Sequence, residues 1–135
     1  MEVRRQVLGD DHVDRAERTK SAFTAPFQEY ITGAAWADVW ARPGIDRRMR
    51  SAITLALLTS LGAEDELAMH VRAARRNGLT EEEIAEVLLH AAVYVGVPAA
   101  NRAFAIAEEA LDRKEVPGPA TPEPAESAPD REEPA

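Results

Sequence analysis

Apolar residues between residues 46 and 111 recur every three or four positions, in stretches that end at glycine or proline. This spacing gathers apolar side chains on one face of a helix. No stretch alternates apolar and polar residues for long enough to predict a strand. The sequence therefore predicts an all-α domain.

The most apolar stretch is RRMRSAITLALLTSL, residues 47–61. Asp46 is a favourable N-cap for a helix there, and Gly62 is a favourable stop. Apolar residues occur on most sides of this helix, so we expect it to be the central, buried one.

Residues 64–77 predict the next helix, with Leu67, Val71 and Ala74 facing the core. The pair Asn77-Gly78 is typical of a helix end.

Thr80 and Glu83 form a capping box that opens a further helix, which we expect Gly96 and Pro98 to close. A last helix is predicted over residues 99–114.

Upstream, Thr24 and Pro26 suit the start of a helix that continues through Tyr30 towards Trp36 and Trp40. The two tryptophans are four residues apart and share one helix face. We expect them to pack against a neighbouring helix or subunit, with a pocket wall as the alternative.

Residues 115–135 differ from the rest in composition. They hold six of the nine prolines, no aromatic residue, six acidic residues and one arginine. Such a segment cannot bury enough apolar surface to fold. We therefore expect one helical domain over residues 1–114 and a disordered, Pro-rich acidic tail over residues 115–135.

The tail also accounts for −5 of the formal charge of −8, which leaves −3 for residues 1–114. This balance gives no general attraction to nucleic acid or anionic lipid. The chain has no cysteine, which excludes disulfides and thiolate chemistry. No apolar run suggests a membrane span or a secretory signal, so we expect a cytoplasmic protein.

Glu66 and His70 stand four residues apart in the stretch EDELAMHVRAARRNGLT. On a helix the carboxylate can accept a hydrogen bond from the imidazole and raise its pKa, giving a proton donor or acceptor near neutral pH. Many helices carry such a pair on their surface, and spacing alone favours that interpretation.

A metal site is disfavoured, because His12 and His90 lie in unrelated segments and no cysteine is available. His90 and Tyr94 also stand four apart, and we interpret them as helix-surface or interface residues.

Arginines cluster around the start of the central helix, where Arg47, Arg50 and Ser51 share one side. Guanidinium groups suit a substrate with more than one carboxylate. Salt bridges to Asp38 and Asp46 are an equally good explanation, and the residues alone do not decide between the two.

Three pieces of the chain together carry a wider resemblance: WARPGIDRR with RSAITL, then ELAMHVRAARRNGLT, then YVGVPAANRAF. From Val3 to Leu111 the sequence resembles the γ-carboxymuconolactone decarboxylases, whose fold is related to alkyl hydroperoxidase D. The resemblance implies an all-α subunit that assembles into a ring-like homo-oligomer, commonly a hexamer.

The resemblance also implies a reaction. This is the cofactor-independent decarboxylation of γ-carboxymuconolactone to β-ketoadipate enol-lactone, in protocatechuate catabolism by the β-ketoadipate pathway. The departing carboxylate sits on a carbon whose electrons delocalise into the conjugated lactone carbonyl, so the substrate supplies its own electron sink. The protein needs to bind carboxylates, stabilise the dienolate oxygen and supply a proton.

Related peroxidases carry two cysteines ahead of the histidine that corresponds to His70, and here those positions hold Ala63 and Glu66. We therefore expect His70, supported by Glu66, to donate the proton. We expect the substrate-binding residues to be Arg47, Arg50 and Ser51.

Two alternatives remain. One is a related enzyme that decarboxylates a different lactone or keto acid, because one fold can serve many substrates. The other is a non-enzymatic helical oligomer that binds a small acid.

Overall fold

The computed structural model describes residues 1–113 as helices joined by short turns, with no strand among them. The all-α prediction is confirmed. The first four helices are α1 (Glu2–Leu8), α2 (Asp10–Thr19), α3 (Ala25–Ile31) and the π-helix η1 (Thr32–Trp40). The other four are α4 (Arg47–Leu61), α5 (Glu64–Arg76), α6 (Glu81–Val95) and α7 (Val97–Asp112).

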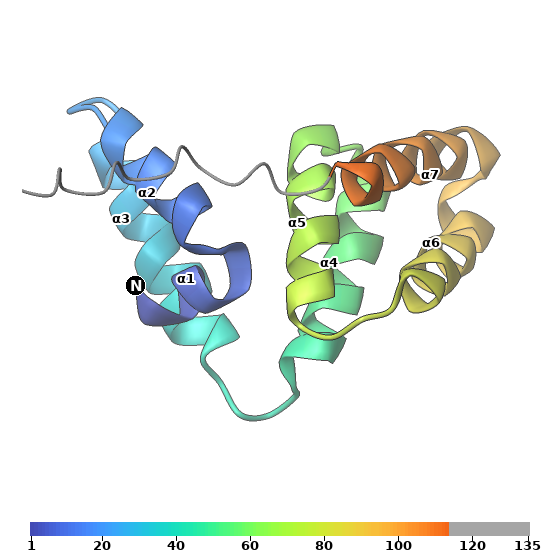
Figure 1. Cartoon of the computed structure of the whole chain (residues 1–135), viewed down its shortest axis with the longest axis horizontal. Helices are drawn as coiled ribbons and strands as arrows, with labels where there is room; N and C mark the ends of the chain where they lie inside the picture. The colour runs from blue at the N-terminus through green and yellow to red at the C-terminus, as the bar shows by residue number, and fades with distance from the viewer. Residues whose placement is uncertain (114–135) are drawn as a thin grey trace, which may run out of the picture.

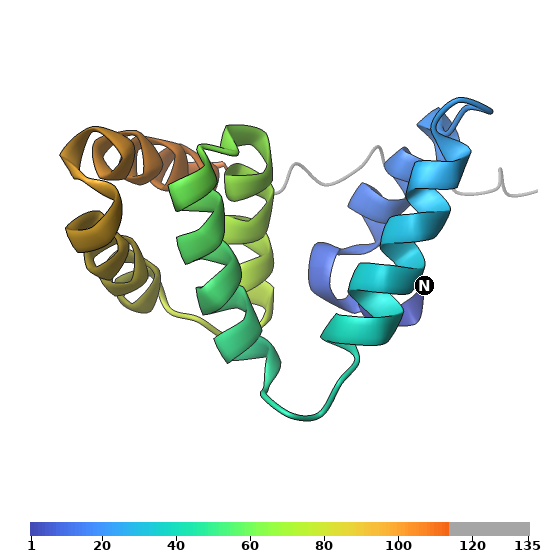
Figure 2. The same ribbon diagram turned by 180° about the vertical axis from the view of Figure 1, so that it is seen from behind.

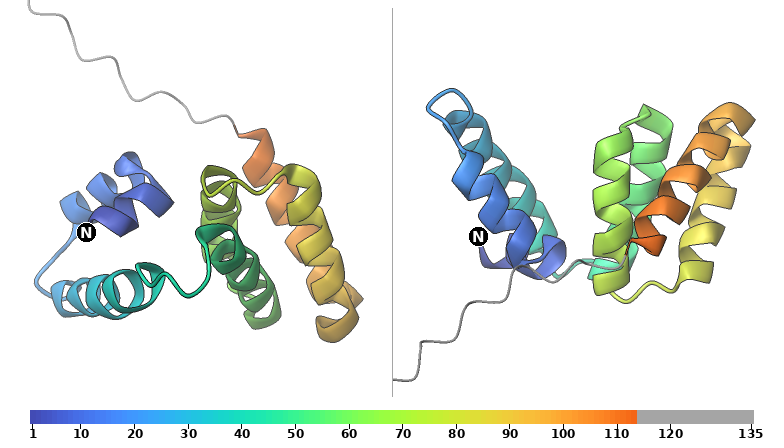
Figure 3. Two further views of the ribbon diagram at one scale, coloured as in Figure 1. Left: turned by 90° about the horizontal axis from the view of Figure 1, so that it is seen from below. Right: turned by 45° about the horizontal axis from the view of Figure 1, so that its top comes forward.

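The helices form two groups, with the helices up to η1 on one side and α4 to α7 on the other (Figure 1). The same division is seen from behind (Figure 2) and from below (Figure 3). In the second group, α5 packs against α4 and α7, and α6 packs against the same two helices. The main contact across the two groups is made by α1 of the first group and α5 of the second. We call this contact the seam.

The predicted caps of the central helices are confirmed. The Asp46 side chain accepts a hydrogen bond of 2.8 Å from the Met49 N–H. Thr80 and Glu83 form the reciprocal capping box at the start of α6. Gly62 ends α4 in the left-handed conformation, with φ of 66°, which glycine adopts without a steric penalty.

Two features of the helices differ from the predictions. The segment that contains both tryptophans is a π-helix, a rare form that is often found at functional sites. The last helix begins at Val97, so Pro98 lies inside its first turn and does not close the helix before it. Proline is tolerated there because the first turn needs no N–H donor.

Two groups of buried residues hold the molecule together. The larger one fills the space between α4, α5, α6 and α7, and includes Leu55, Leu67, Val71, Ile84 and Leu88. As predicted, Leu67, Val71 and Ala74 of α5 belong to it. The smaller one fills the seam, where it consists of Val7, Leu8, Val13, Trp36 and Ala73.

The prediction that α4 is buried on most sides is wrong for the subunit. Leu57 is 56% exposed and Leu61 is 76% exposed, and Met49 and Ile53 in the same row are also exposed. These four residues follow one another at intervals of four along one face of α4. We call them the α4 apolar row.

None of the helices in residues 1–113 is long and apolar enough to cross a membrane. The tail predicted for residues 115–135 lies outside the described residues.

Candidate active site

His70 lies on the face of α5 that meets the first group of helices. Its side chain is almost fully enclosed, with 9% of the residue exposed. The Trp40 ring stacks over the imidazole at a centroid distance of 6.2 Å and an interplanar angle of 20°. The histidine therefore sits in the seam rather than on an open helix surface.

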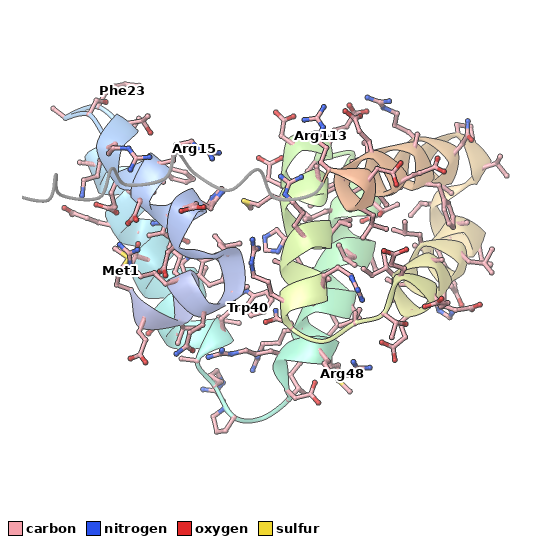
Figure 4. All side chains as sticks on the ribbon, in the orientation of Figure 1. Met1, Arg15, Phe23, Trp40, Arg48 and Arg113 are labelled. Atoms are coloured by element: carbon pink, nitrogen blue, oxygen red, sulfur yellow. The ribbon has the colours of Figure 1, made fainter. Side chains whose placement is uncertain are left out.

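The π-helix brings both tryptophans to this seam. Trp36 is buried with Val7 and Val13 in the smaller core group, and its ring centroid is 5.4 Å from that of Trp40. The expectation that the tryptophans pack against a neighbouring helix is confirmed for Trp36. Trp40 has an additional role, because its ring covers His70. Figure 4 labels Trp40 between the two groups of helices.

The pKa of His70 is lowered to about 4, and burial is the largest cause. A positive charge on His12 lowers the pKa further, and the negative charge of Glu66 raises it by less. The predicted direction of the shift is therefore wrong for the free subunit. The effect of Glu66 has the expected sign, but desolvation of the imidazolium outweighs it.

Glu66 lies on the exposed surface one turn before His70. Nδ1 of His70 is buried and has no hydrogen-bond partner among the described residues. The predicted tautomer-fixing hydrogen bond from the imidazole to Glu66 is absent in this part of the chain. The pair interacts through charge alone.

The three residues predicted to bind substrate lie in the first turns of α4 and contact three different partners. Nη2 of Arg47 donates to Oε1 of Gln6 on α1 at 2.7 Å. Nη2 of Arg50 donates to the backbone oxygen of Arg42, two residues after Trp40, at 3.2 Å. Within residues 1–113, neither arginine forms the salt bridge to Asp38 or Asp46 that the sequence also allowed.

Ser51 is 1% exposed, and its hydroxyl accepts a hydrogen bond of 2.8 Å from Nδ2 of Asn77. Asn77 follows His70 by seven residues, about two turns of α5, so the two residues lie along one side of the chain. The hydrogen bond therefore joins Ser51 to the same side of the chain that carries His70.

The charges on Arg47 and Arg50 have only neutral partners. Nε of Arg50 is buried and has no hydrogen-bond partner in the described part of the chain. Both guanidinium groups therefore keep a positive charge that no carboxylate of residues 1–113 balances. An anionic ligand would do so.

His12 is the residue that the sequence analysis did not connect to this site. It lies on α2, 58 residues before His70 in the chain, yet its charge acts on the pKa of the buried histidine. No spacing rule links two residues on non-adjacent helices. Only the packing of α1 and α2 against α5 places them together.

The described residues contain no group of three or more histidine, cysteine or acidic side chains that could hold a metal ion. The seam instead holds a buried imidazole under an indole ring, and α4 carries two arginines without acidic partners and a buried hydroxyl. These groups can bind an anion, exclude water and transfer a proton.

Two known decarboxylases are similar to the chain over most of its length. The chain is 48% identical to 4-carboxymuconolactone decarboxylase of Acinetobacter baylyi over 109 residues, which are 81% of each chain. It is 46% identical to nitrosuccinic acid decarboxylase of Metarhizium robertsii over 112 residues, which are 83% of this chain and 78% of the relative.

Residues 25–109 match the family described as the carboxymuconolactone decarboxylase family. The match includes η1 with both tryptophans, α4 with its arginines and α5 with His70. On the evidence of this match and of relatives aligned over four fifths of their length, the chain belongs to the carboxymuconolactone decarboxylase family.

Proposed function

We propose that the protein decarboxylates γ-carboxymuconolactone to β-ketoadipate enol-lactone without a cofactor. The observation that carries the proposal is the alignment with 4-carboxymuconolactone decarboxylase over 81% of both chains. His70, the histidine of the family resemblance, is enclosed, and Arg47 and Arg50 on α4 carry charges without acidic partners that suit a carboxylated substrate.

The second relative favours a second candidate substrate, nitrosuccinic acid. Both substrates carry two carboxyl groups and an electron-accepting group. Loss of carbon dioxide leaves a dienolate in the lactone and a nitronate in the nitro compound. The same protein groups serve either reaction, because the substrate in each case takes up the electron pair of the broken bond.

We assign the proton transfer to His70. With a pKa of about 4, only about one free subunit in a thousand carries the imidazolium at pH 7. A bound dianion raises the pKa, because opposite charge favours the protonated ring. The proton donor is therefore formed on substrate binding. Glu66 adds a smaller effect of the same sign.

We assign Arg47, Arg50 and Ser51 to the oxygens of the substrate. A guanidinium on the carboxylate that leaves would stabilise the ground state more than the transition state. The two arginines are more useful on the lactone oxygen, where negative charge develops. Ser51 can accept from Asn77 and still donate its own proton to an oxygen.

We also propose that subunits assemble into a ring-like homo-oligomer, and specifically a hexamer. The exposed α4 apolar row supports association, since contiguous exposed apolar surface marks interaction sites. The buried surface of α7 supports it as well. It consists largely of alanine (Ala100, Ala103, Ala107 and Ala110), whose burial contributes little to the stability of a lone subunit.

The proposed function is tested by supplying the purified protein with γ-carboxymuconolactone and measuring lactone loss together with carbon dioxide release. Nitrosuccinate is assayed in parallel, and the larger kcat/KM identifies the substrate. We expect His70→Ala to reduce turnover by at least about a hundredfold, the usual contribution of a general acid. Glu66→Gln should have a smaller effect.

The matched control is His90→Ala, because His90 is an exposed histidine on α6 that contacts Tyr94 at a ring distance of 5.6 Å. It should keep full turnover. Absence of carbon dioxide release from both substrates would reject the proposed function. Full turnover in folded His70→Ala would reject the assigned proton donor while leaving the activity standing.

A further inference from the structure

A second feature of the seam is a hollow of about 640 Å³ between the start of α2 and one side of α5. We call it the basic hollow. Its lining has more basic than acidic side chains, with four arginines and one histidine against two aspartates. The arginines are Arg15, Arg72, Arg76 and Arg113, the histidine is His12, and the aspartates are Asp10 and Asp11.

The basic groups come from both walls of the hollow. His12 and Arg15 are three residues apart on α2, and Arg72 and Arg76 are four apart on α5, so each pair shares a helix face. The Arg76 guanidinium lies 3.1 Å from the place where a Cβ on Gly9 would stand. Arg72 and Arg76 also interact with other groups of the chain.

Arg15 differs from these two arginines. Its guanidinium has no hydrogen bond or salt bridge to any residue that the structure describes, although it stands next to the hollow. In Figure 4, Arg15 is labelled on the first group of helices and Arg113 on the second. Arginines from both groups of helices therefore line the hollow.

The surroundings of His12 show the same excess of positive charge. Burial lowers the pKa of His12, and the charges of Arg4, Arg15, Arg72 and Arg76 lower it further. An anion in the hollow would reduce this repulsion and gain charge-assisted hydrogen bonds. The volume falls within the range of small-molecule sites.

The basic hollow is also close to the reacting histidine. Met69 lines it, His70 is the next residue, and the charge of His12 acts on His70 across the seam. A ligand of two carboxylates could therefore place one end in the hollow and its reacting end at His70.

We propose that the basic hollow binds the carboxylate that the substrate keeps, with Arg15 and His12 as its ligands. This inference rests on the proposed function, which supplies a substrate with one carboxylate that leaves and one that stays. Cationic groups on the retained carboxylate bind the substrate and the transition state equally, so they lower KM without stabilising the departing group.

The binding test uses adipate, a stable dicarboxylate, with hexanoate as the monocarboxylate of equal length. Adipate should bind the full chain more tightly than hexanoate and should shift the ring-proton signals of both His12 and His70 in NMR spectra. Arg15→Gln should weaken adipate binding about tenfold, as expected from loss of one charge-assisted hydrogen bond. Arg15→Lys, which keeps the charge, should recover part of the affinity.

Arg18→Gln is the matched control, because it removes the same charge from the exposed surface of α2 outside the hollow. It should bind adipate like the unchanged chain. Equal affinity of Arg15→Gln, His12→Gln and the unchanged chain for adipate would overturn the proposal. This binding result does not depend on whether the lactone is the substrate.

The kinetic test uses whichever of the two substrates is turned over. Arg15→Gln should raise KM about tenfold with little change in kcat, and adipate should inhibit the unchanged enzyme competitively. Non-competitive inhibition by adipate would overturn the assignment of the hollow to the substrate. Absence of turnover in the unchanged chain would reject the proposed function and leave the binding test of the hollow intact.

Discussion

At the scale of single residues, burial decides the chemistry of His70. Spacing in the sequence identified the Glu66–His70 pair. It does not reveal that the imidazole is enclosed while the carboxylate is exposed. Desolvation acts on the enclosed group and outweighs one partly solvated charge. The residue was predictable from the family resemblance, and the direction of its pKa shift was not.

The lowered pKa of His70 predicts a pH-dependent stability. The folded pKa of about 4 lies below the unfolded value of 6.5, so the unfolded chain binds this proton first as the pH falls. The contribution is complete above pH 6.5 and is lost between pH 6.5 and about 4, by up to about 3 kcal/mol.

Urea unfolding at pH 7 and pH 4.5 measures this loss. His12 contributes in the same direction, because its pKa is also lowered. The loss should therefore become smaller, but not vanish, in His70→Gln, and it should be unchanged in His90→Gln. An equal loss in His70→Gln and the unchanged chain would contradict the prediction.

A second prediction concerns the partly buried hydrogen bond between Asn77 and Ser51. Asn77→Ala leaves the enclosed Ser51 hydroxyl without its donor and should lower the free energy of unfolding by about 1–3 kcal/mol. In the double variant with Ser51→Ala, both partners are gone. The double variant should therefore be more stable than the sum of the single effects predicts. Additive losses in this double-mutant cycle would show that the two side chains are not coupled.

At the scale of the elements, local signals in the sequence were sufficient where a helix end is set by its own residues. Asp46, Gly62 and the Thr80–Glu83 box act within one turn, and each was predicted correctly. The π-helix was not predicted, because its backbone is a small variation of an ordinary helix. Its two tryptophans pack against residues of α1, α2 and α5, which no local pattern reveals.

The junction of α1 and α2 gives the third prediction. Gly9 has φ of 85° and ψ of 152°, a conformation that is essentially restricted to glycine, and the Arg76 guanidinium lies against it. Gly9→Ala should lower the free energy of unfolding by about 1–3 kcal/mol, because strain and displacement of Arg76 add together. Thermal and urea unfolding measure the change.

Gly44→Ala is the control for that substitution, since Gly44 has open space around its Cβ position. It should change stability by less than about 0.5 kcal/mol, as surface substitutions usually do. Equal effects of the two substitutions would show that neither the backbone of Gly9 nor its contact with Arg76 matters.

At the scale of the whole molecule, the second group of helices followed from sequence periodicity, whereas the position of the first group did not. The seam depends on contacts such as Arg47 with Gln6 and Trp40 with His70, whose partners lie 41 and 30 residues apart. The same kind of long-range information is needed to recognise that α4 keeps an apolar row exposed in the subunit.

The last prediction follows from that row. If subunits bury it in the proposed ring, Leu57→Glu places a carboxylate in an apolar contact, at a cost of several kcal/mol for each unpaired charge. The variant should sediment as smaller species than the unchanged chain, while its far-ultraviolet circular dichroism stays helical because Leu57 is outside the core of the subunit. Ala105→Glu, which adds the same charge at an exposed position of α7, should keep the original assembly. An assembly of unchanged mass in Leu57→Glu would show that the α4 apolar row faces solvent in the oligomer. The interface would then lie among other exposed apolar residues. On α6, the most exposed of these are Val93 and Tyr94.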